Sequence, residues 1–201
     1  MTDVWPLALI LALAACSQAA EDTNALVAAE VSANSPQNSA QEPVARSVPT
    51  RDSVFTQLDM ARCRILEENK EEGPYWLRRC PGHAGWQLDW SDSDLRQGIA
   101  LISPQGRETE LNLSDLVAKG AFNSLGKTVE WRGADPNKPE ALIFRMSVAN
   151  GVEPRLPDIS RLAVVRLTQT PCLVAVIEPG TGQNDRAREI ADGDMATCIA
   201  E

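Results

Sequence analysis

Apolar and polar residues alternate with the period of a β-strand in the second half of the chain. In residues 142–148, four apolar side chains fall at alternate positions, and Arg145 lies among the residues between them. This alternation predicts a half-buried strand. Residues 127–132 show the same period, and the proline-containing segment 133–140 predicts a long hairpin loop between the two strands. Glu130 and Arg145 are then candidates for a cross-strand ion pair on the solvent face.

Further apolar runs predict more hairpins. Residues 162–167 and 172–177 are almost continuously apolar, which indicates a central hairpin covered on both faces. Residues 62–66 and 75–80 are expected to pair around the acidic turn at 67–73. Weaker patterns predict two short strands and a short helix, at residues 85–90, 99–103 and 113–119.

The last predicted element is an amphipathic helix that Asn184 or Asp185 can cap. Its apolar stripe consists of Ala187, Ile190, Ala191 and Met195. A run of strands followed by a terminal helix predicts an α+β fold. We expect one globular domain, residues 53–201, that is mainly an antiparallel β-sheet with the C-terminal helix packed on one face.

The segment before this domain has a different composition. Residues 17–52 are dominated by Ala, Ser, Asn, Gln, Pro and Glu and contain no aromatic residue. Such a segment buries too little apolar surface to offset the entropy of ordering, which predicts a disordered tether over residues 16–52. A flexible chain of about 36 residues spans about 30–36 Å.

The tether follows a motif that resembles a bacterial lipobox. The run Leu13-Ala14-Ala15-Cys16 comes directly after the apolar residues 6–12, a length that suits an export signal and is too short to span a bilayer. The resemblance implies that residues 1–15 are a cleaved signal peptide and that Cys16 carries the lipid. Ser17 resembles the residue tolerated for sorting to the outer membrane, so we expect an anchored protein on the periplasmic side of the cell envelope. Plain secretion and a cytosolic Ala-rich helix are the alternatives.

The cysteine content agrees with export. Lipidation of Cys16 leaves four of the five cysteines, an even number that suits two disulfides in an oxidising compartment. Three pairings are possible. The pairs Cys63–Cys80 and Cys172–Cys198 are favoured because each closes a local loop, and four buried free thiols are the alternative.

Three motifs lie in the region from residue 63 to residue 192: Glu130-Trp131-Arg132, Ala141-x-Ile143-x-Arg145, and Cys172-x-Val174-Ala175 followed by Asn184-x-x-Ala187-Arg188-Glu189-x-Ala191-Asp192. Together they resemble uncharacterised exported proteins of proteobacteria. The resemblance implies an exported domain and brings no activity with it.

Candidate chemistry is sparse. His83, the one histidine, follows Cys80 at a zinc-like spacing, but a structural zinc site needs four ligands, and we expect neither a metal nor a cofactor. Asp89, Asp92 and Asp94 lack the glycine and distal glutamate of a calcium loop, so turn and capping roles are favoured. We therefore predict no catalytic residues, although paired carboxylates of a hydrolase would be invisible in the sequence.

Binding residues are easier to nominate. A net charge of −9 argues against nucleic acid as a partner. Trp76, Trp86 and Trp90 are candidates for a ligand groove, because tryptophan is favoured at binding hot spots, although core packing also explains them. The adjacent Arg78 and Arg79 suit carboxylates or phosphates, and ordinary surface ion pairs are the alternative.

These features predict a non-catalytic binding or assembly module. Its expected partners are the membrane, through the lipid anchor, and another envelope protein or envelope component. An envelope hydrolase that uses acidic residues and a purely structural spacer are the alternatives.

Overall fold

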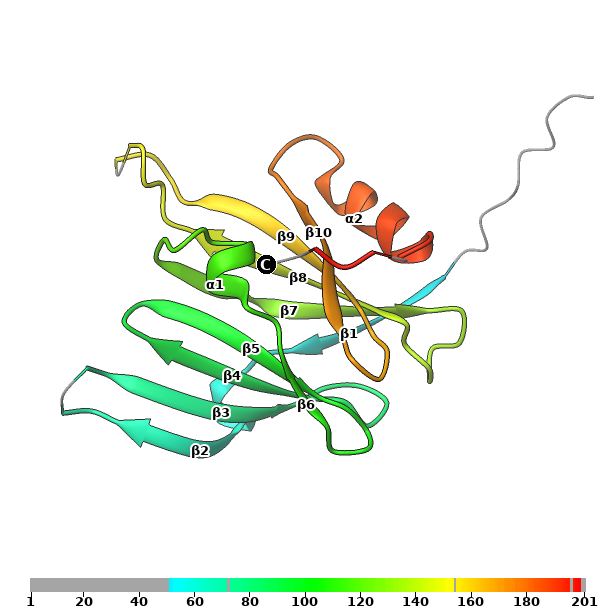
Figure 1. Ribbon diagram of the computed structural model, residues 1–201, viewed down its shortest axis with the longest axis horizontal. Coiled ribbons are helices and arrows are strands. Elements are labelled where there is room, and N and C mark those ends of the chain that lie inside the picture. The colour runs from blue at the N-terminus through cyan, green and yellow to red at the C-terminus, as the bar shows by residue number, and fades with distance from the viewer. Residues whose placement is uncertain (1–50, 72, 154, 196, 200–201) are drawn as a thin grey trace, which may run out of the picture. The chain divides into compact units, whose positions relative to one another are not determined.

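Two antiparallel five-stranded sheets form the framework of the described residues (Figure 1). The computed structural model describes residues 51–199 except 72, 154 and 196. The predicted signal peptide (residues 1–15), Cys16 and residues 16–50 of the predicted tether lie outside the described residues. All described residues belong to one compact unit.

The first sheet, here called sheet A, has the strand order β1-β7-β8-β9-β10. Its strands are β1 (Asp52–Gln57), β7 (Asn123–Gly133), β8 (Ala141–Val148), β9 (Ile159–Arg166) and β10 (Cys172–Ile177). The second sheet, sheet B, has the order β2-β3-β4-β5-β6. Its strands are β2 (Arg64–Asn69), β3 (Tyr75–Pro81), β4 (Gln87–Ser93), β5 (Arg96–Ile102) and β6 (Glu108–Glu110).

The main core lies between the two sheets. Trp131 and Phe144 of sheet A are almost fully buried and share one apolar cluster with Leu88 and Leu101 of sheet B. The helix α1 (Leu113–Leu116) and the turn after it add Leu113, Val117 and Ala118 to this cluster. The predicted alternation of β8 is confirmed, since its even-numbered residues from Leu142 to Val148 all face this core.

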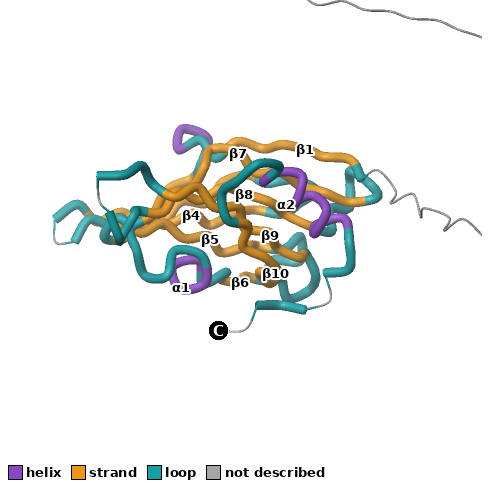
Figure 2. Tube along the Cα trace, turned by 90° about the horizontal axis from the view of Figure 1, so that it is seen from above, coloured by secondary structure: helices purple, strands orange, loops and turns teal. Residues whose placement is uncertain are grey.

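The helix α2 (Gln183–Asp192) covers the outer face of sheet A, where it packs against β8, β9 and β10 (Figures 1 and 2). Ala187 and Ala191 are fully buried against Ile143 and Val164 in a second apolar cluster. This arrangement confirms the predicted α+β class, with a mainly antiparallel sheet structure and a C-terminal helix on one face.

The predicted start of this helix was wrong. Gly182 occupies the N-cap position with a left-handed backbone (φ 71°), two residues before Asn184, and no side chain caps the helix. Gly193 ends it, as glycine commonly does, although Gly193 is extended rather than left-handed. Met195 extends the apolar stripe beyond the end of the helix.

One predicted hairpin and two predicted short strands differ from their predictions. The apolar pair β9 and β10 was expected at the centre of a sheet, but β10 is an edge strand. Its free edge is partly covered by the C-terminal segment, where the Ile199 amide donates to the Leu173 carbonyl over 2.8 Å. Strands β4 and β5 are longer than predicted and meet at a tight turn in which Asp94 and Leu95 both have positive φ. A leucine at such a position gives no turn signal in the sequence.

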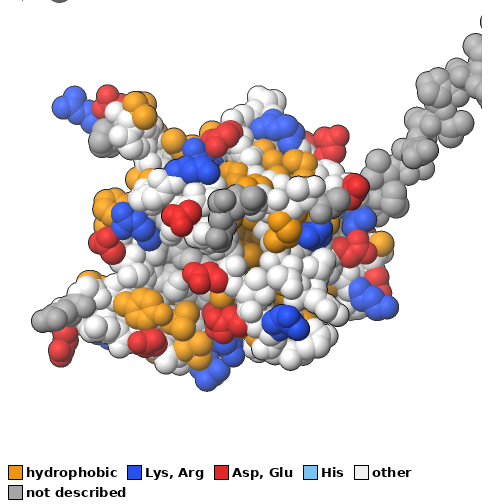
Figure 3. Space-filling view, in the orientation of Figure 1, with side chains coloured by type: hydrophobic (Ala, Val, Ile, Leu, Met, Phe, Trp, Pro, Cys, Tyr) orange, Lys and Arg blue, Asp and Glu red, His pale blue; other side chains and the backbone are white. Residues whose placement is uncertain are grey.

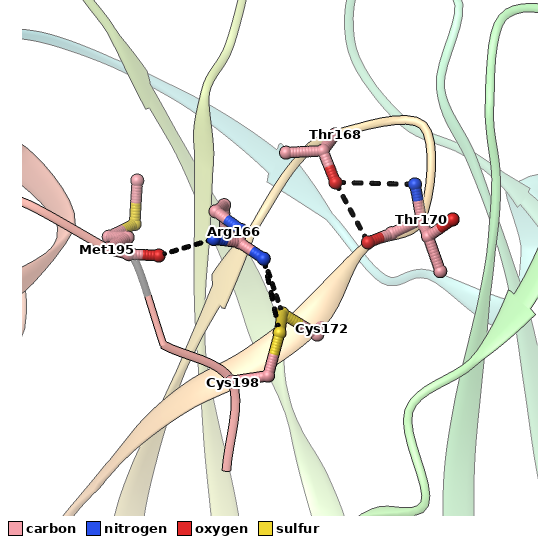
Figure 4. Close-up of a disulfide and its surroundings, with 6 residues drawn as sticks. All are labelled: Arg166, Thr168, Thr170, Cys172, Met195 and Cys198. Carbon is pink, nitrogen blue, oxygen red and sulfur yellow. Dashed lines mark hydrogen bonds between the residues drawn. A yellow bond between two sulfur atoms is a disulfide. The ribbon is translucent and has the colours of Figure 1, made fainter. Parts of the chain in front are cut away.

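Both favoured disulfides are present. Cys63 is bonded to Cys80, and Cys172 to Cys198. The second bond holds the C-terminal segment against β10, and the Arg166 guanidinium lies against its sulfur atoms while donating to the Met195 carbonyl (Figure 4). The two bonds therefore fasten opposite parts of the fold, the first within sheet B and the second at the edge of sheet A.

The turn after β3 tests how tightly the core is packed. A Cβ atom at Gly82 would lie 2.6 Å from the Trp86 carbonyl oxygen and 2.9 Å from Cζ2 of Trp131. We expect Gly82→Ala to lower the free energy of unfolding by about 1–3 kcal/mol, because neither the backbone nor the buried indole has room to move. Urea denaturation measures this change.

Gly151→Ala is the matched control, since a Cβ there meets no heavy atom within 4 Å. It should change the free energy of unfolding by less than about 0.5 kcal/mol. Equal stability of the two variants would contradict the tight contact between Gly82 and Trp131.

Candidate functional site

A cavity of about 660 Å³ opens where β1 leads into the short 3₁₀ helix η1 (Met60–Arg62). Two tryptophans form its aromatic wall: Trp76 of β3 and Trp90 of β4. Cross-strand pairing sets Trp76 opposite Asp92 and Trp90 opposite Arg78, so the two indoles are diagonal neighbours on one face of sheet B. Their rings meet edge to face, with centroids 5.0 Å apart. We call this cavity the tryptophan cleft.

The remaining wall of the tryptophan cleft mixes apolar and polar groups. Leu58, Met60 and Leu125 supply apolar surface, and the polar residues that line it include Asp59 and Lys127. Met60 is 40% exposed, so the cleft is accessible from solvent. A mostly apolar cavity of this size with a few polar groups is typical of a ligand-binding site.

Gln97 holds the shape of the tryptophan cleft. Its Oε1 accepts hydrogen bonds from Trp90 Nε1 (3.2 Å) and from the Leu125 amide (2.8 Å), and its Nε2 donates to Asp92 (2.9 Å). One side chain therefore links sheet B to β7 of sheet A across the cleft. The buried indole N–H has a partner, as buried tryptophans usually do.

The structure brings together only part of the predicted binding set. Trp76 and Trp90 line the cleft. Arg78 lies beside Trp76, with its guanidinium carbon 5.8 Å from the ring centroid, but it is not part of the lining and forms an ion pair with Glu68 over 3.7 Å. Trp86 does not line the cleft, since it is buried in the core beside the turn that carries His83. The burial of Trp86 agrees with the alternative that this tryptophan packs in the core rather than binding a ligand.

Arg79 points to the other face of sheet B. It donates two hydrogen bonds of 2.6 Å to the carboxylate of Asp89, which is only 3% exposed. The hydrogen bond to Asp89 raises the pKa of Arg79 above its ordinary value. This pair agrees with the alternative that Arg79 forms an ordinary ion pair. It occupies the guanidinium N–H groups that an external anion would need.

His83 has a structural environment. Its imidazole is hydrogen-bonded to the Pro136 carbonyl, and its ring centroid lies 6.2 Å from that of Trp131. Cys63 and Cys80 are bonded to each other and are not available as metal ligands. Within residues 51–199, apart from the three gaps, no group of three or more His, Cys, Asp or Glu residues is arranged to hold a metal ion.

A second cavity, of about 280 Å³, lies between α2 and the outer face of sheet A. Its charged lining residues are Lys127 and Glu130 of β7, Arg145 of β8 and Arg188 of α2. We call it the helix pocket. The sequence analysis missed it, because its walls come from strands and a helix that are far apart in the chain.

The predicted ion pair between Glu130 and Arg145 was wrong. Register places Ile143 opposite Glu130, and α2 covers the face that was expected to meet solvent. Arg145 instead donates to three neutral acceptors, and Glu130 receives its ion pairs from Arg132 (2.9 Å) and Arg188 (2.9 Å). The sequence predicts the C-terminal helix, but no local pattern indicates that it covers the face of β7 and β8 that carries Glu130 and Arg145.

Glu130 is 9% exposed and belongs to a network of buried charges. Burial disfavours its charged form, but hydrogen bonds from Arg188, Ser53 and Arg132 outweigh that effect and hold its pKa below the ordinary value of 4.5. Arg132 also donates two hydrogen bonds to Asp192 of α2, at 2.8 and 2.6 Å, and these raise the pKa of Arg132. The network therefore fastens α2 to sheet A.

Comparison with known proteins adds no relative. No protein-family model matches the chain, and neither the curated proteins nor the solved structures include a significant match. The resemblance to a lipobox and to exported proteins therefore stays a prediction. Among the described residues, no helix has the length and apolar character needed to cross a membrane.

The lowered pKa of Glu130 predicts a pH-dependent stability. The stabilisation is complete above the pKa of the unfolded state, near 4.5, and is lost as the pH falls through the lower pKa of the folded state. Glu130→Gln should lower the free energy of unfolding at pH 7 by about 1–3 kcal/mol, since it removes the carboxylate that Arg132 and Arg188 share, although Arg132 keeps Asp192. Urea denaturation from pH 7 to about pH 3 should show this difference shrinking.

Glu178→Gln is the control for this experiment. Glu178 also pairs with an arginine, Arg161, over 2.8 Å, but its side chain is 62% exposed. Removal of such a surface pair should cost less than about 1 kcal/mol. A difference between wild type and Glu130→Gln that stays constant with pH would show that ionised Glu130 does not stabilise the fold.

Proposed function

We propose that this protein is a non-catalytic binding module of the cell envelope, and that the tryptophan cleft is its recognition site. The observation that carries the proposal is a solvent-accessible cavity of about 660 Å³ with Trp76 and Trp90 in its wall. Tryptophans in a partly apolar cavity are typical hot spots of recognition. A structural spacer has no use for such a cavity, so the cleft favours binding over the spacer alternative.

The partner that fits best is a second envelope protein with an exposed aromatic or aliphatic side chain. The tryptophan cleft is lined by the indoles of Trp76 and Trp90 and by Leu58, Met60 and Leu125, so an apolar group is favoured over a charged one. Met60 adds a flexible, polarisable surface at the opening, which suits an inserted side chain. In this proposal the lipid on Cys16 holds the module at the membrane and the tether lets it reach partners nearby.

The hydrolase alternative receives less support from the acidic residues. Asp89 and Glu130 are held by arginines, and the pKa of Glu130 is lowered, whereas a general acid needs a raised one. Both carboxylates therefore have structural partners. The binding module remains the proposal that the geometry supports best.

Site-specific photo-crosslinking in intact cells tests the cleft. A photoreactive side chain at position 60 should give one discrete protein adduct, because Met60 lies at the opening of the cleft. The same group at position 95 should give none, although Leu95 is 64% exposed. Trp76→Ala should reduce the adduct about tenfold or more, as expected for a hot-spot residue.

Phe122→Ala is the matched control for Trp76→Ala, because Phe122 is a 46% exposed aromatic residue outside the cleft that packs against Arg96. It should leave the adduct unchanged. Circular dichroism and thermal unfolding should show both variants folded. Equal adducts from positions 60 and 95, or an adduct that survives Trp76→Ala, would reject the cleft as the recognition site.

Intact mass spectrometry of protein from native membranes tests the anchor and the compartment. We expect a chain that begins at Cys16 with acyl groups attached, because the preceding motif resembles a lipobox. Thiol labelling should modify the four cysteines of the two disulfides only after reduction: Cys63, Cys80, Cys172 and Cys198. An unprocessed chain with five reactive thiols would remove the anchor and the envelope location from the proposal.

A further inference from the structure

The helix pocket contains a guanidinium that forms no ion pair with any carboxylate of the described residues. Arg145 donates to Ser160 Oγ over 2.6 Å, and to Gln183 Oε1 and Asn184 Oδ1 over 2.8 Å each. All three acceptors are neutral. A guanidinium has five N–H groups, so two of those on Arg145 have no partner among the described residues. The side chain is thus held in place and still able to bind an anion.

The pocket as a whole is cationic. Arg188 is paired with Glu130 through hydrogen bonds of 2.9 and 3.2 Å, so these two charges cancel. Lys127 forms no ion pair with any described residue, and it lines the pocket together with Arg145. Two positive charges therefore remain at one concave site, in a chain whose net charge is −9.

The backbone of β7 brings these cations together. Pairing between β7 and β8 shifts register between Leu125 and Val129, and this irregularity contains Gly126 and Lys127. A Cβ atom at Gly126 would lie 3.0 Å from Cβ of Arg145, so the glycine allows the two strands to approach closely here. Irregular pairing of this kind is common next to binding sites, because it redirects side chains.

The other walls limit the size and chemistry of the ligand. The cavity of about 280 Å³ has room for a small group, and Phe55, Ile143 and Leu162 add apolar surface to its lining. Phe55 is 53% exposed at the surface of β1. A planar guanidinium matches a carboxylate in geometry. The Glu130 carboxylate in the wall disfavours a dianion such as phosphate more than it disfavours a monoanion.

We propose that the helix pocket binds a small monocarboxylate that carries an apolar side chain, with Arg145 and Lys127 as its anion ligands. The carboxylate belongs either to the C-terminus of a peptide that ends in an apolar residue or to a free carboxylic acid. Both sources share the chemistry that the pocket recognises. This proposal does not depend on the function of the tryptophan cleft.

Isothermal titration calorimetry on the full mature chain tests the proposal with four probes. N-acetyl-leucine represents a peptide terminus, hexanoate represents a free acid, N-acetyl-leucinamide lacks the carboxylate, and inorganic phosphate is the competing anion. We expect saturable binding of at least one carboxylate, below a Kd of about 1 mM, and none of the amide. Tighter binding of N-acetyl-leucine identifies the peptide source, and tighter binding of hexanoate identifies the free acid.

Arg145→Gln should weaken carboxylate binding about tenfold to a hundredfold, as expected for loss of a charged hydrogen-bond donor. Lys127→Gln should weaken it severalfold, and this exposed side chain is not needed for folding. Arg107→Gln is the matched control, because it removes the same charge from an exposed loop residue between β5 and β6 and should leave the Kd unchanged.

Three results would overturn the proposal. The first is an absence of saturable carboxylate binding with a Kd below about 1 mM. The second is equal binding of phosphate or of the amide. The third is equal weakening by Arg107→Gln and Lys127→Gln, which would show that only net charge matters. The Lys127 variant keeps the test decisive if Arg145→Gln does not fold.

Discussion

The buried charges beneath α2 are the interaction on which the arrangement of sheet A depends. Arg132 donates to Asp192 of α2, to Glu130 of its own strand and to Ser53 of β1, so one guanidinium joins three elements. A buried charge is costly unless its donors have partners, and here carboxylates on two sides supply them. Because β1 and α2 come from opposite ends of the described chain, this network links two elements that the ladder with β7 and the apolar cluster under α2 each place on the sheet separately.

Both candidate sites border one irregularity in β7. The strand β7 has 11 residues, and its pairing with β8 is interrupted between Leu125 and Val129. Lys127 lies in this interval and lines both cavities, the tryptophan cleft and the helix pocket. Its backbone carbonyl also accepts a hydrogen bond from the Leu58 amide, 2.7 Å away, at the end of β1. A regular ladder would have left less space on both sides of the sheet.

The sequence predicts what local periodicity and spacing determine. The alternation in β8, the hairpins and the two disulfides each involve segments that are close in the chain, and all of them are present in the structure. Long-range pairing carries no such signal. The strand β1 pairs with β7, although all five strands of sheet B lie between them in the sequence. Glu130 pairs with Arg188 rather than with the predicted Arg145, because α2 covers that face of the sheet. The helix pocket was therefore not predictable, whereas the tryptophan cleft was predictable in part.

The charge distribution of the pocket itself argues for a ligand. Arg79 and Arg132 each donate two hydrogen bonds to one carboxylate. Carboxylates are abundant partners for arginine in a chain with net charge −9. Arg145 is held by neutral side chains instead and forms no ion pair with a carboxylate of the described residues, at a concave surface that it shares with Lys127. Such a charge gains little for the stability of the fold, because neutral acceptors cannot offset its partial desolvation as a carboxylate does. An anion that binds from outside would supply the missing partner.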